Sequence, residues 1–506
     1  MQPFFPSNSA RNARFLTAAI VGVFLGCTMG CGGCVSRETT VSTVPAPKPF
    51  AGIALVISCP DPAISSVLGP ISRSWASRTG ATVTSSTQQQ ADITILRPFA
   101  FGEAAAKGEI LPLPKSVREP AHPFQMSTIP DVFSEGVAGW AGKPFGVVIA
   151  TEAVVLVYRK DLFDDITTRT AFKTRANREL APPNSWDDAV TIAEFFRERN
   201  GKPSLGPLPA SPAKLIDLFN RVAACTERPS ITPSNTAGRK LNDLAFAAEA
   251  VTFHFRYDSG APRLTSPGFA LAASQLARLQ PFRAEGTSDD PVADLEKDAV
   301  FAVLTMAELA KLPKGADGAV LPKFGIARLP GSRRYYDALT NAVVPVNGAE
   351  ANYIPYYTGG LIGCVSSQSK NAEAAFDLLA ELGGPNGAAA IVGEPACGSG
   401  PWRPNLIEAS KKNLWYSYGL SATETDALLR AIKPYVMSDL RNPVVAPRSP
   451  GMEKLFATLE PHVRSAITGK VKPEEAMAAA QTEWNKMEAA AGPDVVKWRK
   501  ADMRGE

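Results

Sequence analysis

The stretch that decides the fold is GKPFGVVIATEAVVLVYRKDLF, residues 142–163. It holds two short apolar runs, which the polar pair Thr151-Glu152 separates, and it ends in charged residues. The stretch is too short and too interrupted to cross a bilayer, which takes about 20 consecutive apolar residues. It is also untypical of one continuous strand. We therefore interpret it as two short buried strands joined end to end, with a polar break between them.

The chain is long enough to form more than one domain. Its 506 residues exceed what a single hydrophobic core usually holds. Hydrophobic residues make up 45% and charged residues 20%, which is ordinary for a globular protein. The net charge of +4 is small for this length, and no run of Lys and Arg is interleaved with aromatic residues. We therefore expect no nucleic-acid partner.

Residues 1–34 have the pattern of an export signal. Arg11 and Arg14 precede an apolar run at 15–26, which has signal-peptide length and is too short for an ordinary transmembrane helix. A small residue before a cysteine at the end of such a run resembles the bacterial lipoprotein signal, in which the cysteine is lipidated. The cysteines that follow the run are Cys27, Cys31 and Cys34.

Cys27 is the predicted lipidation site, and Cys31 is the next candidate. An ordinary cleaved signal and an uncleaved anchor are the alternatives. Residues 35–50 are rich in Ser, Thr and Pro, which predicts a flexible tether. We expect a protein anchored by lipid on the outer face of a bacterial membrane, in the periplasm or at the cell surface.

The body shows no motif for catalysis or metal binding. Its three histidines are not spaced as metal ligands, and H-E-x-x-H, G-x-S-x-G and the phosphate-binding glycine loops are absent. We predict no cofactor, no metal and no enzymatic activity. Export would permit a disulfide, and its pairing stays open among four cysteines with no C-x-x-C spacing: Cys59, Cys225, Cys364 and Cys397.

Strands and helices alternate at the start of the body. A β-rich run at 53–58 precedes a helical pattern at 64–80, and further strands are expected at 81–86 and 91–98. Ser185 and Asp188 predict a capping box at the start of a helix that ends at Gly201. This alternation is typical of α/β lobes with parallel sheets.

Five segments of the body also have counterparts in a known family. They are KGEILPLP (107–114), the opening stretch (142–163), PPNSWDDAVTIAEFF (182–196), GGLIGCVSSQSKNAEAAFDLLAEL (359–382) and TGKVKPEEAMAAAQTEWNKM (468–487). In this order they resemble segments of the extracellular solute-binding proteins of ABC importers, the broad family that contains sugar-binding proteins. Arg159 stands where that family often has Asn, so no ligand contact is carried over to this position.

The resemblance implies the type II periplasmic-binding-protein fold. Two α/β lobes, each a mostly parallel sheet flanked by helices, would hold a solute in the cleft between them. Lobe 1 would comprise 51–148 and 326–385, lobe 2 would comprise 149–325 and 386–490, and 491–506 would form a tail. Thr151-Glu152 would then mark the point where the chain changes lobes.

Candidate ligand contacts lie in loops that would face this cleft. Sugar pockets combine aromatic rings, which pack on the apolar face of a pyranose, with polar groups that bind its hydroxyls. The candidates are Asp61, Arg97, Phe99, Glu152, Tyr356, Tyr357, Gly359, Gly360, Trp402 and Arg403. The loops 356–360 and 402–403 are favoured among them.

The expected function is capture of a small solute, with carbohydrate as the default, and its delivery to an ABC permease. The protein would be a monomer with the permease, the solute and the membrane as partners. Two alternatives remain: a sensory or scaffolding lipoprotein with the same fold, and a secreted hydrolase that uses carboxylates in a cleft. An acidic pair facing a pocket would favour the hydrolase.

Overall fold

The fold is built on two separate sheets. The computed structural model describes residues 48–86, 91–236, 238, 240, 252–437 and 439–504. The first sheet has the strand order β2-β1-β3-β13-β6, with bounds Thr82–Ser86, Ala54–Ser58, Ile93–Leu96, Leu361–Val365 and Val147–Ala150. The second has the order β8-β7-β9, with bounds Phe301–Thr305, Val154–Arg159 and Phe324–Ala327.

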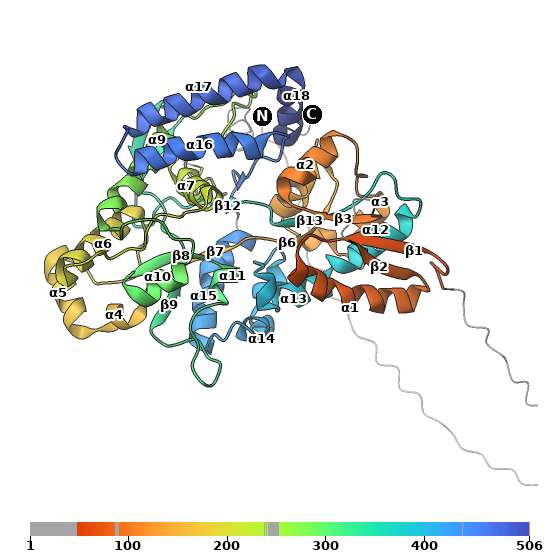
Figure 1. Cartoon of the computed structure of the whole chain (residues 1–506), viewed down its shortest axis with the longest axis horizontal. Helices are drawn as coiled ribbons and strands as arrows, with labels where there is room; N and C mark the ends of the chain where they lie inside the picture. The colour runs from red at the N-terminus through yellow and green to blue at the C-terminus, as the bar shows by residue number, and fades with distance from the viewer. Residues whose placement is uncertain are drawn as a thin grey trace, which may run out of the picture. The chain divides into compact units, whose positions relative to one another are not determined.

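The opening stretch forms the end-to-end strand pair that the sequence predicts. β6 lies at the edge of the first sheet and β7 in the middle of the second, and Figure 1 shows the chain passing from one to the other. Every residue of β6 is buried, as are the first four of β7. Both runs are apolar because both strands are covered by other parts of the fold.

Strand direction differs from the expectation of mostly parallel sheets. β1 runs parallel to β2 and β3, but β13 is antiparallel to β3 and β6, and β7 is antiparallel to β8 and β9. The reason lies in the chain path. β6 ends where the chain leaves the first sheet and β13 begins where the chain returns to it, so the two strands run in opposite directions. The α/β class itself is confirmed.

Helices cover both faces of the first sheet. Figure 1 shows α1 and α2 on opposite sides of it, and α12 and α13 pack against α1. Asp61 caps α1 by accepting the N–H groups of Ala63 and Ile64, and Gly80 ends it in the left-handed conformation. The helices of this lobe are α1 (Pro62–Thr79), α2 (Pro98–Ala106), α3 (Lys115–Arg118), α12 (Ala372–Leu382), α13 (Pro385–Val392) and α14 (Asn413–Tyr416).

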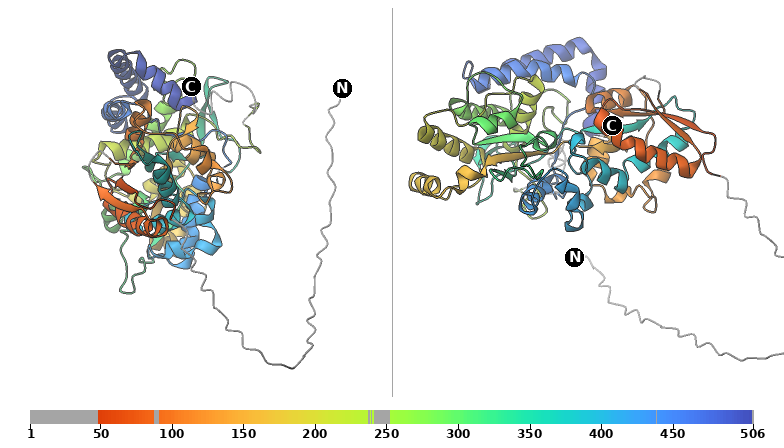
Figure 2. Two further views of the ribbon diagram at one scale, coloured as in Figure 1. Left: turned by 90° about the vertical axis from the view of Figure 1, so that its right-hand side faces the viewer. Right: turned by 60° about the horizontal axis from the view of Figure 1, so that its bottom comes forward.

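The remaining helices pack around the second sheet or against one another. The predicted capping box is present, because Ser185 and Asp188 bond each other's backbone at the start of α6. These helices are α4 (Lys160–Asp164), α5 (Ile166–Ala176), α6 (Trp186–Asn200), α7 (Pro212–Thr226), α9 (Pro267–Leu279), α10 (Pro291–Lys297), α11 (Met306–Leu309), α15 (Ala422–Val436), α16 (Met452–Ile467), α17 (Pro473–Ala491) and α18 (Pro493–Arg504). Figure 2 shows α16 and α17 side by side.

Short strand pairs complete the fold. They are β4–β5 (Gly139–Trp140 and Lys143–Pro144), β10–β11 (Arg334–Asp337 and Ala342–Pro345) and β12–β14 (Tyr356–Tyr357 and Val444–Val445). β12 matters for the site, because it lies on the return path from the second sheet to β13.

If each sheet is taken as the centre of one lobe, the boundaries differ from the expected ones at two points. The whole of β9 pairs with β7, so the chain leaves the second sheet after Ala327 rather than at 326. α13 packs against α1, α12 and β6, which places 385–392 with the first sheet.

The predicted tail contains a docked helix. In α18 the Asp502 carboxylate forms a buried ion pair with Arg448, with an Nη2–Oδ1 distance of 2.6 Å. Residues 1–34, the lipidation candidate Cys27 and most of the tether lie outside the described residues. No described helix is long and apolar enough to span a membrane.

Candidate functional site

The first connection between the sheets, Thr151 to Ala153, is held by a turn from a distant part of the chain. The Thr151 N–H donates to Ser399 Oγ (3.1 Å), and the Thr151 hydroxyl donates to the Gly400 carbonyl (3.0 Å). The Gly400 N–H donates back to the Thr151 carbonyl (2.8 Å). A Cβ on Gly400 would lie 2.5 Å from the Ala153 Cβ, so only glycine allows this close approach.

The second connection enters β13 through Gly359 and Gly360. Both glycines have positive φ, 95° and 64°. A Cβ on Gly360 would lie 2.2 Å from the Ala150 carbonyl oxygen, so this glycine lets the returning chain pass against the end of β6. The two connections therefore lie next to each other, and side chains at one can reach the other.

Arg221 of α7 joins a charged cluster at these connections. Its Nε donates to Asp217 Oδ2 at 2.7 Å, and its Nη2 lies 3.6 Å from Glu152 Oε2. The Thr358 hydroxyl, from the second connection, donates to Glu152 Oε2 at 2.8 Å. The Arg221 side chain is 2% exposed, whereas Glu152 keeps 47% and Asp217 30%. The cluster thus has a buried cation and two carboxylates that reach solvent.

Burial and charge shift the pKa values in this cluster. The pKa of Glu152 is raised, first by loss of water around the carboxyl group and then by the nearby Asp217 carboxylate; Arg221, Thr358 and Arg97 act in the opposite direction. For Arg221, burial is the largest influence and works to lower the pKa, but Asp217, Tyr435 and Glu152 together outweigh it and the pKa is raised. Arg221 therefore stays charged, and Glu152 is the member of the pair that takes up a proton more readily.

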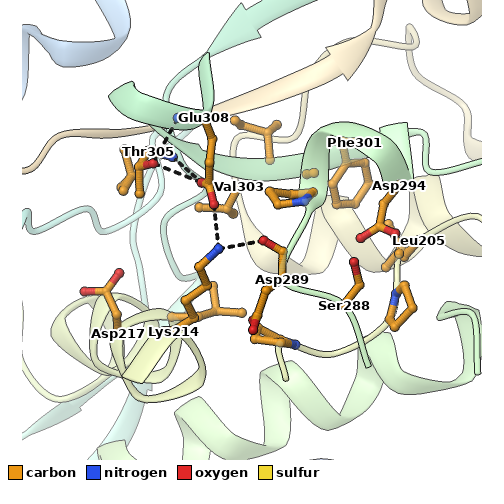
Figure 3. A pocket seen from close by; sticks show the side chains of 18 of the residues that line it. Leu205, Lys214, Asp217, Ser288, Asp289, Asp294, Phe301, Val303, Thr305 and Glu308 are labelled. Atoms are coloured by element: carbon orange, nitrogen blue, oxygen red, sulfur yellow. Dashed lines mark hydrogen bonds and ion pairs between the residues drawn. The ribbon is translucent and has the colours of Figure 1, made fainter. Parts of the chain in front are cut away.

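A pocket of about 320 Å³ opens beside the cluster, on the second sheet. Figure 3 shows Lys214 of α7 reaching across it, with its ammonium group between Glu308 of α11 and the loop that carries Asp289. Lys214 Nζ donates to Glu308 Oε1 and to the Asp289 carbonyl, each at 2.7 Å. Glu308 Oε2 also accepts the N–H and hydroxyl of Thr305 in the capping box of α11. This wall of the pocket is therefore fixed by paired charges.

The pocket combines apolar and polar surfaces. Its apolar lining includes Val154 and Leu156 of β7, Phe301 and Val303 of β8, and Trp186 of α6. Glu152 and Asp217 lie in its polar lining, next to the connections. Arg283, another lining residue, donates to the carbonyls of Gly206 and Pro207, and burial lowers its pKa to about 10. Such a mixture suits a solute with both C–H faces and hydroxyl groups.

Of the residues named from the sequence, Glu152 is the one that lines this pocket. Arg97 is exposed at the start of α2 and contributes to the field at Glu152. Gly359 and Gly360 form the second connection. Asp61 caps α1, and Phe99 contacts the ring of Phe456 with a centroid distance of 6.0 Å.

Neither Tyr356 nor Tyr357 is in the lining of this pocket, and Tyr357 borders a second cavity of about 880 Å³. Both are 3% exposed. The Tyr356 hydroxyl accepts from Asn220 Nδ2 (3.3 Å), and the Tyr357 hydroxyl donates to the Tyr435 carbonyl (3.0 Å). Burial raises the pKa of both phenols, so neither ionises near neutral pH. Both rings are packed in the core, and their role as ligand contacts stays a prediction.

Trp402 and Arg403 do not reach the pocket. They are 0% and 1% exposed, and Trp402 belongs to the core that includes the first sheet. Arg403 donates to the carbonyls of Phe124 (2.7 Å) and Gly383 (3.0 Å). Both side chains are therefore buried in this structure, and Arg403 holds backbone carbonyls; the predicted ligand contact at this loop stays a prediction.

Four residues of the site were not predicted from the sequence: Lys214, Asp217 and Glu308, which line the pocket, and Arg221 beside it. Asp217 and Arg221 had a detectable signal, because they stand four residues apart on α7 among buried apolar residues such as Phe219 and Val222. A charged pair at this spacing in an apolar helix indicates a buried ion pair. The predicted contacts were confined to loops, whereas these four residues lie on α7 and α11.

Among the described residues, no group of three or more His, Cys, Asp or Glu side chains is placed to hold a metal ion. The four cysteines of the body are free thiols. Burial raises the pKa of the Cys225 thiol to about 11, with smaller opposing contributions from the Ile354 backbone and Arg328. The Cys225 thiol is therefore protonated at neutral pH.

Comparison with solved structures identifies the fold. The chain matches a cyclic α-maltosyl-1,6-maltose binding protein from Arthrobacter globiformis, with a TM-score of 0.60, 14% identity and coverage of 86% of this chain and 98% of that one. It matches the maltose-bound MalE3 of T. maritima at 0.56 and 15%, covering 86% and 100%. A solute-binding protein of Thermotoga lettingae bound with α-D-tagatose gives 0.55 and 14%, covering 86% and 99%. No family model and no curated protein sequence matches.

Proposed function

Since the chain has the fold of two-lobe sugar-binding proteins, we propose that it captures a small carbohydrate and delivers it to the permease of an ABC importer. The observation that carries the proposal is the pocket beside the two connections, with Glu152 and Asp217 in its lining. A solute bound there touches the segment at which the two sheets are joined. Its binding can therefore favour one arrangement of the sheets over another, as hinge closure requires.

The lining suits carbohydrate chemistry. Carboxylates accept hydrogen bonds from hydroxyl groups, and Glu152 and Asp217 both face solvent through the pocket. Phe301 and Val303 of β8 form part of an apolar wall for C–H faces. Lipid anchoring at Cys27 would keep the protein close to its permease, and the tether that follows would let it move between solution and membrane.

The test is a thermal-shift screen followed by calorimetry with maltose, cyclic maltosyl-maltose and tagatose. A solute that binds the native state at a hundredfold excess over its Kd raises stability by about 2.7 kcal/mol. We expect at least one sugar to raise the Tm of the wild type and to lose affinity in Asp217→Asn. The control is Asp494→Asn, at an exposed position of α18. If no carbohydrate in a broad panel shifts the Tm, the proposal fails.

The same pocket keeps the hydrolase alternative open to test. Glu152 and Asp217 both line it, and the pKa of Glu152 is raised, as that of a general acid would be. We expect no release of p-nitrophenol from p-nitrophenyl glucosides or maltosides. Turnover that disappears in Glu152→Gln would instead establish a glycosidase.

A further inference from the structure

Arg221 contacts more of the site than any lining residue does, although it does not line the pocket itself. Its Nη1 donates to the Tyr356 carbonyl (3.2 Å) on the second connection and to the Tyr435 hydroxyl (3.1 Å) on α15. Its Nε and Nη2 face the two carboxylates of the pocket, Asp217 and Glu152. One guanidinium therefore touches both the residues that would meet a solute and the chain that joins the sheets.

The carboxylates leave part of their bonding capacity unused. Asp217 Oδ1 is buried without a hydrogen-bond partner, while Oδ2 is held by Arg221. Arg221 Nη2 is likewise buried and makes no hydrogen bond, at 3.6 Å from Glu152. A small movement of Glu152 toward Arg221 would turn this ion pair into a hydrogen bond. Buried polar atoms without a hydrogen-bond partner are expected where a bound ligand supplies the missing hydrogen bonds.

The local charge indicates what kind of solute completes them. The Glu152 and Asp217 carboxylates face the Arg221 guanidinium, and the positive charge of Arg97 also acts on Glu152. Lys214 and Glu308 neutralise each other across the pocket. A neutral donor such as a hydroxyl group fits this balance, whereas a free ammonium or carboxylate group would leave an unpaired charge.

We propose that Arg221 is the positioning residue that couples solute in the pocket to both connections between the sheets, and that the pocket takes a neutral, polyhydroxylated solute. This rests on the proposed function. Hydroxyl groups of the solute bind Asp217 and Glu152, and both carboxylates then pack more closely against Arg221. Arg221 in turn holds the Tyr356 carbonyl, and Glu152 holds the Thr358 hydroxyl. The connections then become less mobile when solute is bound.

The first experiment needs no ligand. Hydrogen exchange is measured on peptides that cover 147–158 and 356–365 in the wild type, Thr358→Val and Arg221→Lys. We expect both variants to exchange about tenfold faster there, because local opening of the connections becomes easier, with little change elsewhere. The control is Thr482→Val, which removes an exposed hydroxyl that bonds only within α17. Unchanged exchange at both connections in both variants would overturn the coupling.

The second experiment uses maltose, glucosamine and glucuronate as probes in calorimetry. We expect maltose to bind, the two charged sugars to bind at least about tenfold more weakly, and Arg221→Lys to weaken maltose about tenfold. Tighter binding of either charged sugar would overturn the neutral-solute assignment. If no carbohydrate binds the wild type, the proposed function fails, while the exchange result still decides whether Arg221 holds the connections.

Discussion

Arg221 and Arg403 are both buried arginines, with 4% and 1% exposure, yet their surroundings differ. Arg221 is matched by carboxylates, since Asp217 accepts from it and Glu152 lies 3.6 Å away. These carboxylates outweigh burial and raise its pKa. It therefore remains a cation at the edge of the pocket.

Arg403 is surrounded by uncharged acceptors. It donates to three backbone carbonyls and to Thr128 Oγ1, and its guanidinium lies over the ring of Phe124 at 5.2 Å. Among the described residues no carboxylate forms an ion pair with it, and burial lowers its pKa to about 10. Arg221, with its carboxylates, belongs to the candidate binding site, whereas Arg403, without them, connects loops through backbone carbonyls.

The largest expected effect is that of Arg403→Met. The change leaves several buried carbonyls without a donor, and each unsatisfied group costs about 1–3 kcal/mol. We expect the free energy of unfolding to fall by about 4 kcal/mol in urea titrations. Solute affinity of the protein that remains folded should be unchanged. A loss of affinity without a loss of stability would reverse the comparison.

Arg221→Met should destabilise less but damage function more. Removing one partner of a buried ion pair costs about 3–5 kcal/mol, and the solvent contact of Glu152 and Asp217 reduces this to about 2–3 kcal/mol. Calorimetry should show affinity for a bound sugar reduced more than tenfold. If both arginine variants kept wild-type affinity, Arg221 would be a structural residue like Arg403.

A matched pair of smaller changes sharpens the contrast. Tyr435→Phe removes the hydroxyl that accepts from Arg221, and Thr128→Val removes one that accepts from Arg403. Each should cost about 1 kcal/mol of unfolding free energy, the usual value of one hydrogen bond. Only Tyr435→Phe should also weaken solute binding, measured under the same conditions. Equal effects of the two variants on affinity would contradict the distinction.

The smallest effect is a pH dependence that arises at the Arg221 cluster. Because the pKa of Glu152 is raised in the native state, the native protein holds this proton at pH values where the unfolded chain has released it. Its contribution to stability therefore falls as pH rises from about 4.5, the ordinary glutamate value, through the raised pKa. We expect less than about 1 kcal/mol, because the side chain is 47% exposed. Glu152→Gln should abolish this slope, whereas the exposed Glu474→Gln should leave it intact.

The sequence is informative where local rules decide the structure. The two apolar runs on either side of Thr151-Glu152 predict β6 and β7, and both strands are confirmed. The capping box at Ser185 predicts the start of α6, which is also confirmed. Strand direction depends on which edge of a sheet the chain enters, so the antiparallel placement of β13 and β7 has no local signal.

The candidate site shows the same limit. Glu152 could be found because it interrupts an apolar stretch, and it lines the pocket. Trp402 and Arg403 follow a glycine-rich segment whose composition predicts an exposed turn. In the structure, tertiary packing buries both side chains. Asp217 and Arg221 sit on a helix whose orientation toward the pocket is set by α9 and α16, which are distant in sequence.

The position of β13 has a consequence for how the chain is made. β6 is hydrogen-bonded to the first sheet only through β13, which lies between β3 and β6. A nascent chain that has been synthesised as far as Ala150, or even as far as β9, therefore still lacks β13, the strand with which β6 pairs. Contacts between such distant segments form slowly, since a long loop must close before they contribute. β6 therefore cannot take its place in the first sheet until residue 365 has been synthesised.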